Sequence, residues 1–137
     1  DEVIIRCSSL SQEVQNVQRV LAELLANKSN ITFFKGETEF YIPLERVLFF
    51  ETEVSGICAH TTDNVYSVKH KLYELEEMLP GYFMRVSKST ILNVNQIYSM
   101  THNLSTSEVQ FQGTHKQAFV SRLYYKPLKL KLLEKRR

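Results

Sequence analysis

From Ile31 onward, the chain consists of short runs of β-branched and aromatic residues, separated at close intervals by turn-forming residues. This texture constrains the fold more than any other feature, because a helix needs a longer stretch of 3.6-residue periodicity than these runs supply. It predicts a mainly β domain. Two hairpins are expected first, one joining Ile31–Lys35 to Glu39–Ile42 and one joining Ile57–Thr61 to Val65–Val68.

The rest of this domain is expected to contain a central strand, several short strands and two helices. Val47 to Phe50 is a nearly continuous apolar run after Pro43, which is typical of a strand buried on both faces. An amphipathic helix is predicted from Leu72 to Leu79, ended by Pro80-Gly81, and a last helix from Leu123 to Leu133. The further expected strands are Met84–Val86, Ile91–Val94, Ile97–Met100, Val109–Phe111 and Ala118–Val120.

Residues 1–30 are expected to form a separate β-α extension, and residues 31–137 the β domain. Val3 to Cys7 is a short β-rich run, and Ser9 with Gln12 has the capping-box spacing that begins a helix over residues 11–26. This helix has one apolar stripe, formed by Val14, Val17, Leu21, Leu24 and Leu25. The stripe either folds back on the β domain or pairs with a second copy to give a homodimer.

The composition is that of an ordinary globular protein, with 43% hydrophobic residues. No apolar run approaches the roughly 18 residues of a membrane span, and Asp1-Glu2-Val3-Ile4 lacks the regions of a signal peptide. The expectation is a cytoplasmic protein without membrane insertion. Cys7 and Cys58 lie far apart in the sequence and are interpreted as reduced thiols, with a disulfide as the alternative.

The charges are distributed unevenly along the chain. Residues 1–81 carry thirteen Asp or Glu and seven Lys or Arg, a net of −6, whereas residues 82–137 carry two and ten, a net of +8. This asymmetry favours a surface that faces a polyanion, with the acidic part kept away from it. The alternative is that two oppositely charged faces attract each other within the fold.

Sequence signatures of catalysis are absent, so neither catalytic residues nor a cofactor are expected. The chain has no Gly-rich phosphate loop, no Gly-x-Ser-x-Gly elbow and no His-Glu-x-x-His. Glu51 and Glu53 straddle the end of a strand and are interpreted as an acidic loop rim. No metal site is expected, because the histidines fall on separate predicted elements: His60, His70, His102 and His115.

Two stretches have the residue types that contact nucleic acid. In the first, Arg85, Ser87, Lys88, Ser89 and Thr90 interrupt a series of core residues, which predicts a presented loop. Its hydroxyls suit phosphate oxygens, and its lysine can reach guanine acceptors in the major groove. A solvated turn is the alternative.

In the second stretch, a strand passes directly into the last helix at Ser121-Arg122. Ser121 can cap the helix, whose N-terminal amides favour anions, and the guanidinium of Arg122 suits guanine or phosphate. Lys126 follows one turn later. A structural cap beside an exposed arginine is the alternative.

Four ordered blocks together resemble the LytTR family of DNA-binding domains, over about Asn30 to Leu133. They are Leu48 to Glu51, Leu72 to Pro80, Phe83 to Ile97 and Val120 to Arg122. The resemblance implies an elongated β-β-β arrangement with short helices, whose loops enter successive major grooves of a repeated double-stranded DNA site. Such domains usually belong to bacterial response regulators.

Carried over by position, the resemblance places Lys88, Arg122 and the loop from Glu53 to Gly56 against the duplex. The family often has His-Arg-Ser or His-Asn-Ser where this chain has Ser87-Lys88-Ser89, so a frequent histidine contact is missing. In the first loop, Ser55 and Gly56 offer a hydroxyl and a flexible backbone instead of a histidine or asparagine. About 30 residues precede the domain, which is similar to the stand-alone members that have no receiver domain.

The sequence therefore predicts a sequence-specific transcriptional regulator. Its predicted DNA-binding residues are Lys88, Arg122, Ser87, Ser89, Ser121, Ser55, Gly56, Arg85 and Lys126. A protein-interaction module would also explain the apolar stripe and the modest net charge. An RNA-binding β domain is the other alternative, with stacking of bases on exposed aromatics from among Tyr82, Tyr98, Tyr124 and Tyr125.

Overall fold

The computed structural model of the chain describes residue 16 and residues 31–135. The chain divides into two compact units, Asp1–Asn30 and Ile31–Arg137, and the second is described here by itself. The predicted strand near Val3 and the predicted helix over residues 11–26 with its apolar stripe lie outside the described residues.

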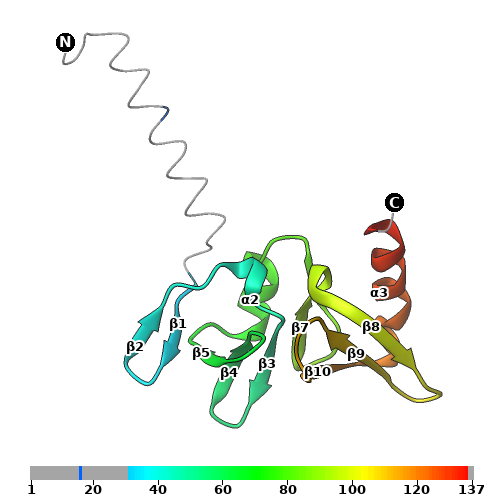
Figure 1. Cartoon of the computed structure of the whole chain (residues 1–137), viewed down its shortest axis with the longest axis horizontal. Helices are drawn as coiled ribbons and strands as arrows, with labels where there is room; N and C mark the ends of the chain where they lie inside the picture. The colour runs from blue at the N-terminus through cyan, green and yellow to red at the C-terminus, as the bar shows by residue number, and fades with distance from the viewer. Residues whose placement is uncertain (1–15, 17–30, 136–137) are drawn as a thin grey trace. The chain divides into compact units, whose positions relative to one another are not determined.

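The second unit is built from ten strands, two α-helices and two 3-10 turns within residues 31–135 (Figure 1). The helices are α2 (Leu72–Met78) and α3 (Arg122–Lys135), and the 3-10 turns are η1 (Leu44–Arg46) and η2 (Val94–Gln96). The strands are β1 (Phe33–Lys35), β2 (Thr38–Phe40), β3 (Phe49–Glu53), β4 (Gly56–His60), β5 (Val65–Val68), β6 (Phe83–Arg85), β7 (Thr90–Asn93), β8 (Ile97–His102), β9 (Ser107–Phe111) and β10 (Gln117–Val120).

The strands form two sheets in which every pairing is antiparallel. The larger sheet has seven strands in the order β2-β1-β5-β4-β3-β7-β6, and the smaller has three in the order β10-β9-β8. In Figure 1, β1 and β2 lie at one end of this unit and the smaller sheet with α3 at the other. The predicted mainly β class with short helices is confirmed, as are both predicted hairpins.

The central strand differs slightly from its prediction. It begins at Phe49 instead of Val47, because η1 and the two residues after it lead into the sheet, and it continues to Glu53. The amide of Leu48 nevertheless donates to the carbonyl of His60 at 2.7 Å. The strand lies between β4 and β7, so its predicted interior position in the sheet is confirmed.

The side chains of β3 and β7 alternate between two apolar cores. Phe50 and Ile91 belong to one core, whereas Phe49 and Leu92 belong to the other, and all four are buried. This arrangement follows from the geometry of a strand, in which successive side chains point to opposite faces. The apolar run that marked β3 in the sequence is therefore explained by burial on both sides.

Each helix covers one of these cores. Leu72 and Leu75 of α2 pack into the core that contains Phe50, and Leu128 of α3 packs into the core that contains Phe49. Leu128 is fully buried, and burial of a leucine side chain contributes about 1.5 to 3 kcal/mol to stability. Within the described residues, neither helix is long and apolar enough to cross a membrane.

Asn93 is a buried polar residue that fixes the start of the central strand. Its side-chain amide donates to the carbonyls of Glu45 at 3.2 Å and Val47 at 3.0 Å, and its Oδ1 accepts from the amide of Asn95 at 2.9 Å. Because a buried amide without partners would be costly, these bonds specify one alignment of η1 against β7.

Candidate nucleic-acid interface

Two backbone hydrogen bonds join three segments that are far apart in the sequence. The amide of Thr52, near the end of β3, donates to the carbonyl of Ser89 at 2.9 Å. The amide of Ser121, just before α3, donates to the carbonyl of Val86 at 2.9 Å. The β6–β7 loop therefore lies between the β3–β4 turn and the β10–α3 junction. These are the segments that the resemblance assigned to DNA, and together they are called the three-segment surface below.

The β6–β7 loop presents one cation at its tip. Lys88 is exposed, whereas Ser87 and Ser89 on either side are half-buried. The carbonyls of both Ser87 and Lys88 accept hydrogen bonds from the guanidinium of Arg85. The loop is thus a short, internally bonded structure that exposes the ammonium of Lys88 to solvent.

The hydroxyls of this loop bond to one another. The amide of Ser89 donates to Oγ of Ser87 at 3.2 Å. Oγ of Ser89 lies 3.4 Å from Oγ of Ser87 and 3.4 Å from Oγ1 of Thr90. Thr90 is 2% exposed, and its hydroxyl donates to the carboxylate of Glu51 at 3.4 Å. Thr90 is therefore not part of the presented loop, contrary to the sequence interpretation.

The β10–α3 junction presents two cations on one side of the helix. Arg122 is the first residue of α3, and Lys126 follows four positions later, so both lie on the same helix face. Both side chains are exposed. The carbonyl of Ser121 accepts from the amide of Tyr124 at 3.0 Å, which begins the helix at the predicted position.

The β3–β4 turn is exposed throughout. Glu53 pairs with Gly56 in the antiparallel register, which leaves Val54 and Ser55 as the turn residues. Gly56 has a φ of +131°, a conformation that residues with a side chain rarely adopt. The glycine is thus required by the backbone of the turn.

One cluster of titratable groups was not foreseen from the sequence. The carboxylates of Glu51 and Glu53 and the imidazole of His60 lie within 4.8 Å of one another. The register of β3 with β4 brings them together, because Phe49 pairs with His60 and Glu51 with Cys58. Only the hairpin register could have predicted this, since the histidine and the two carboxylates belong to separate strands.

Within this cluster His60 and Glu53 are already paired. Nε2 of His60 lies 3.2 Å from Oε2 of Glu53, and the imidazole stacks on Phe49 with ring centroids 4.4 Å apart. Burial lowers the pKa of His60, although the bond to Glu53 opposes this shift. Burial, and then the nearby carboxylate of Glu53, raise the pKa of the free Cys58 thiol. The thiol is therefore protonated near pH 7, so it is not an activated nucleophile.

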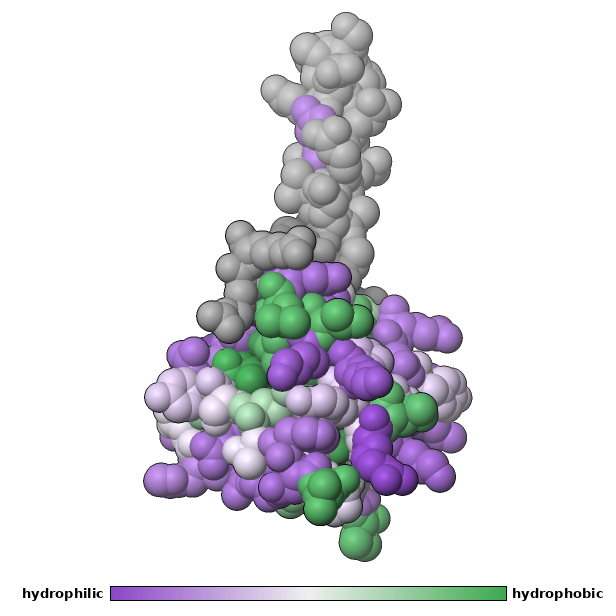
Figure 2. Space-filling view, turned by 90° about the vertical axis from the view of Figure 1, so that its right-hand side faces the viewer, coloured by the Kyte–Doolittle hydropathy of each residue, from purple (hydrophilic) through white to green (hydrophobic). Residues whose placement is uncertain are grey.

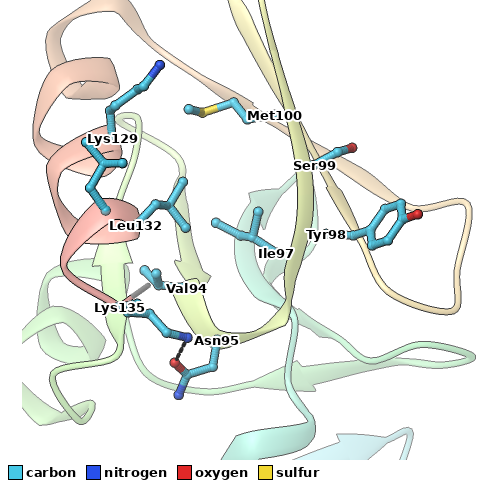
Figure 3. A pocket seen from close by; sticks show the side chains of 10 residues that line it. Val94, Asn95, Ile97, Tyr98, Ser99, Met100, Lys129, Leu132 and Lys135 are labelled. Atoms are coloured by element: carbon cyan, nitrogen blue, oxygen red, sulfur yellow. Dashed lines mark hydrogen bonds between the residues drawn. The ribbon is translucent and has the colours of Figure 1, made fainter. Parts of the chain in front are cut away.

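The face on the α3 side of the unit is largely hydrophilic, with separate hydrophobic patches (Figure 2). The exposed leucines of α3 are Leu123, Leu130 and Leu133. A groove of about 390 Å³ lies between α3 and β8, and in Figure 3 the side chains of Val94, Ile97, Met100 and Leu132 extend into it. At one end, the ammonium of Lys135 bonds to Oδ1 of Asn95. No acidic or histidine side chain is among the groove residues that the structure describes.

Comparison with known proteins decides the family. Residues 37–133 match the model of the LytTr DNA-binding domain. This chain belongs to the LytTR family of DNA-binding domains. Its membership means that the three-segment surface lies within a DNA-binding domain.

The LytTR chain is similar to several curated proteins of Staphylococcus aureus. It is 25% identical over 128 residues to an uncharacterized HTH-type transcriptional regulator of strain COL, with 93% of this chain and 86% of that protein covered. Another such regulator, from strain MRSA252, is 28% identical over 89 residues, with 65% and 60% covered.

A solved structure shares the fold of this LytTR chain. It is the LytTr DNA-binding domain of a putative methyl-accepting/DNA response regulator from Bacillus cereus, with a TM-score of 0.67 and 24% identity. The likeness covers 75% of this chain and 95% of that one.

Although the staphylococcal relatives are named HTH-type, five strands separate α2 from α3 here, so residues 31–135 contain no helix-turn-helix pair.

Proposed function

We propose that this LytTR chain is a transcriptional regulator that recognises specific double-stranded DNA sites through its three-segment surface, and that it acts by binding and not by catalysis. The observation that carries the proposal is the bond between Val86 and Ser121, which holds two exposed cations, Lys88 and Arg122, on adjoining segments of a DNA-binding domain. The names of the staphylococcal relatives support the regulatory role.

The charge distribution supports the choice of this surface. Both cationic segments belong to residues 82–137, which carry a net charge of +8. Phosphate attraction supplies most of the affinity of such proteins for any duplex, and contacts with base edges supply the preference for one sequence. A surface with a few presented cations beside a basic helix satisfies both requirements.

Each predicted site residue other than Arg85 is assigned a DNA contact in the proposal. Lys88 and Arg122 read base edges in the major groove, because their side chains are exposed and match guanine acceptors. Lys126 of α3 contacts phosphates. The small residues let the backbone approach the duplex, and the hydroxyls among them donate to phosphates: Ser55, Gly56, Ser87, Ser89 and Ser121.

The test begins with selection of bound fragments from a pool of duplexes, followed by fluorescence-anisotropy titration at two or more salt concentrations. Lys88→Ala and Arg122→Ala are each expected to weaken binding to the selected site by about 1 to 3 kcal/mol, with less effect on a mixed duplex. Lys126→Ala and Lys129→Ala serve as matched controls, since they are expected to weaken both duplexes alike.

Two results would contradict the proposal. One is a parent chain that selects no duplex sequence. The other is that Lys88→Ala and Arg122→Ala bind the selected site as tightly as the parent does. Either result would remove base recognition from these two side chains.

An RNA-binding role has weaker support, because most of its candidate stacking residues have other partners. Tyr82 packs against one core beside Phe83, with ring centroids 5.0 Å apart, and Tyr124 packs against the other core. Tyr125 stacks on His102, with ring centroids 3.8 Å apart. Tyr98 is 73% exposed and so available for stacking. Single-stranded RNA in the same titration separates the roles, because an RNA-binding domain would prefer it to the duplex.

The proposal also includes a homodimer formed through the apolar stripe predicted for residues 11–26. A dimer matches a DNA site built from two repeats and makes the phosphate contacts of both copies act together. Binding is then cooperative in protein concentration and steeply dependent on salt.

A further inference from the structure

Arg85, at the end of β6, uses three nitrogen atoms of its guanidinium on three different acceptors. Nε donates to the carbonyl of Ser87 at 2.8 Å, and Nη2 donates to the carbonyl of Lys88 at 2.7 Å. Nη1 donates to the carboxylate of Glu76 on α2 at 2.9 Å. One side chain thus joins the body of the domain to two consecutive peptide groups of the β6–β7 loop.

The surroundings of Arg85 argue against a direct contact with DNA. Its side chain is 21% exposed, whereas the neighbouring Lys88 is exposed. A phosphate that approached the guanidinium would also meet the carboxylate of Glu76, which already balances its charge. Arginine is suited to the observed role, because its planar fork can hold several carbonyls in one fixed geometry.

We infer that Arg85 is a positioning residue, which fixes the backbone of Ser87 and Lys88 so that the ammonium of Lys88 is held towards the bases, and which does not itself contact DNA. The inference rests on the proposed function and departs from the sequence prediction that Arg85 is a DNA-binding residue. It assigns to Arg85 an effect on sequence preference without a contribution to phosphate attraction.

A lysine at position 85 provides the most direct test. Arg85→Lys keeps the positive charge but has one ammonium in place of the fork, so it cannot hold both carbonyls and Glu76 in the same geometry. Affinity for the selected duplex is expected to fall about tenfold, which corresponds to a loss of about 1.4 kcal/mol. Affinity for a mixed duplex is expected to stay within about twofold of the parent.

The salt dependence distinguishes positioning from contact. Each phosphate contact contributes about 0.9 to the slope of log K against log salt concentration. Arg85→Ala is therefore expected to keep the slope of the parent on the mixed duplex. A slope smaller by about 0.9, together with equal loss of affinity for both duplexes, would show a direct phosphate contact and overturn the inference.

Two control variants isolate the bonds to the loop. Glu76→Gln removes the charge partner but leaves both carbonyl bonds, so its ratio of selected to mixed affinity is expected to stay within about twofold of the parent. Arg46→Ala removes an exposed arginine of η1, outside the three-segment surface, and should also leave this ratio unchanged. A loss of preference in either control as large as in Arg85→Lys would overturn the inference.

A measurement without DNA keeps the inference testable on the folded domain. The amide of Ser89 bonds to Oγ of Ser87 inside the loop. If Arg85→Lys loosens the loop, hydrogen exchange at the amide of Ser89 should become faster than in the parent. The urea midpoint should change little. A parent chain that selects no duplex would overturn the proposed function, whereas a selective parent with an equally selective Arg85→Lys variant would overturn this inference alone.

Discussion

Truncation of Phe49 to alanine tests the central feature of the fold, the burial of one β3 side chain between the two sheets. Phe49 is 3% exposed and belongs to the core that also contains residues of the smaller sheet. Its ring stacks on His60 of β4 with centroids 4.4 Å apart and on Phe111 of β9 at 5.4 Å. Removal of the ring therefore opens a cavity at the contact between the sheets.

The expected cost follows from these contacts. Truncation of a buried phenylalanine costs about 3 to 5 kcal/mol, which includes the lost transfer free energy and the cavity. An aromatic pair adds about 0.5 to 1.5 kcal/mol beyond the buried area, and Phe49 stacks on two rings. The cost should thus lie at the upper end, about 4 to 5 kcal/mol, against a total stability of about 5 to 15 kcal/mol for such a domain.

Urea unfolding of the parent and the variant, monitored by circular dichroism, measures this difference. Phe119→Ala is the matched control, since it removes the same ring from a residue of β10 that is 56% exposed, and it should change the free energy of unfolding by less than about 0.5 kcal/mol. Phe83→Ala, in the other core, should cost about 3 to 5 kcal/mol. A loss below about 1 kcal/mol for Phe49→Ala would refute its burial between the sheets.

Three further predictions follow from other parts of the chain. Gly56→Ala should lower the free energy of unfolding by about 1 to 3 kcal/mol in urea titration, because the φ of Gly56 is +131°. Gly81→Ala should be nearly neutral, because Gly81 has no positive φ and an added Cβ would meet open space. Folding lowers the pKa of His60, so the unfolded state binds more protons than the folded state. The free energy of unfolding should therefore fall as the pH drops through about 6.5, and the His60→Phe variant should lose this pH dependence. Leu21→Glu with Leu24→Glu should convert a dimer to a monomer in light scattering and abolish cooperative DNA binding; a monomeric parent, or a variant that stays dimeric, would rule out this helix as the contact.

The local elements of the β domain followed from the sequence alone. Periodicity and turn residues indicated the hairpins, the position of α2 before Pro80-Gly81 and the start of α3 near Ser121, because these features depend on neighbouring residues. The apolar run before Glu51 also indicated that the central strand is buried on both faces. The presented cations Lys88 and Arg122 could be named for the same reason, since polar interruptions of apolar runs mark exposed loops.

Only the tertiary structure decided which of these elements meet. Strand order and register place Ser89 beside Thr52 and Val86 beside Ser121, across 37 and 35 positions of sequence. The same register brings His60 to Glu53.

The guanidinium of Arg85 shows the limit most clearly. Its residue type and its place in a basic stretch predicted a DNA contact, which stays a prediction, but nothing in the sequence indicated its hydrogen bonds to Glu76 and to the loop backbone. A sequence pattern shows which residues are polar, but the acceptors within reach of a side chain depend on how α2, β6 and the loop pack. For this reason, the sequence alone determined the type of domain and its candidate cations, whereas only the fold decided which cation is exposed and which one bonds to the loop backbone.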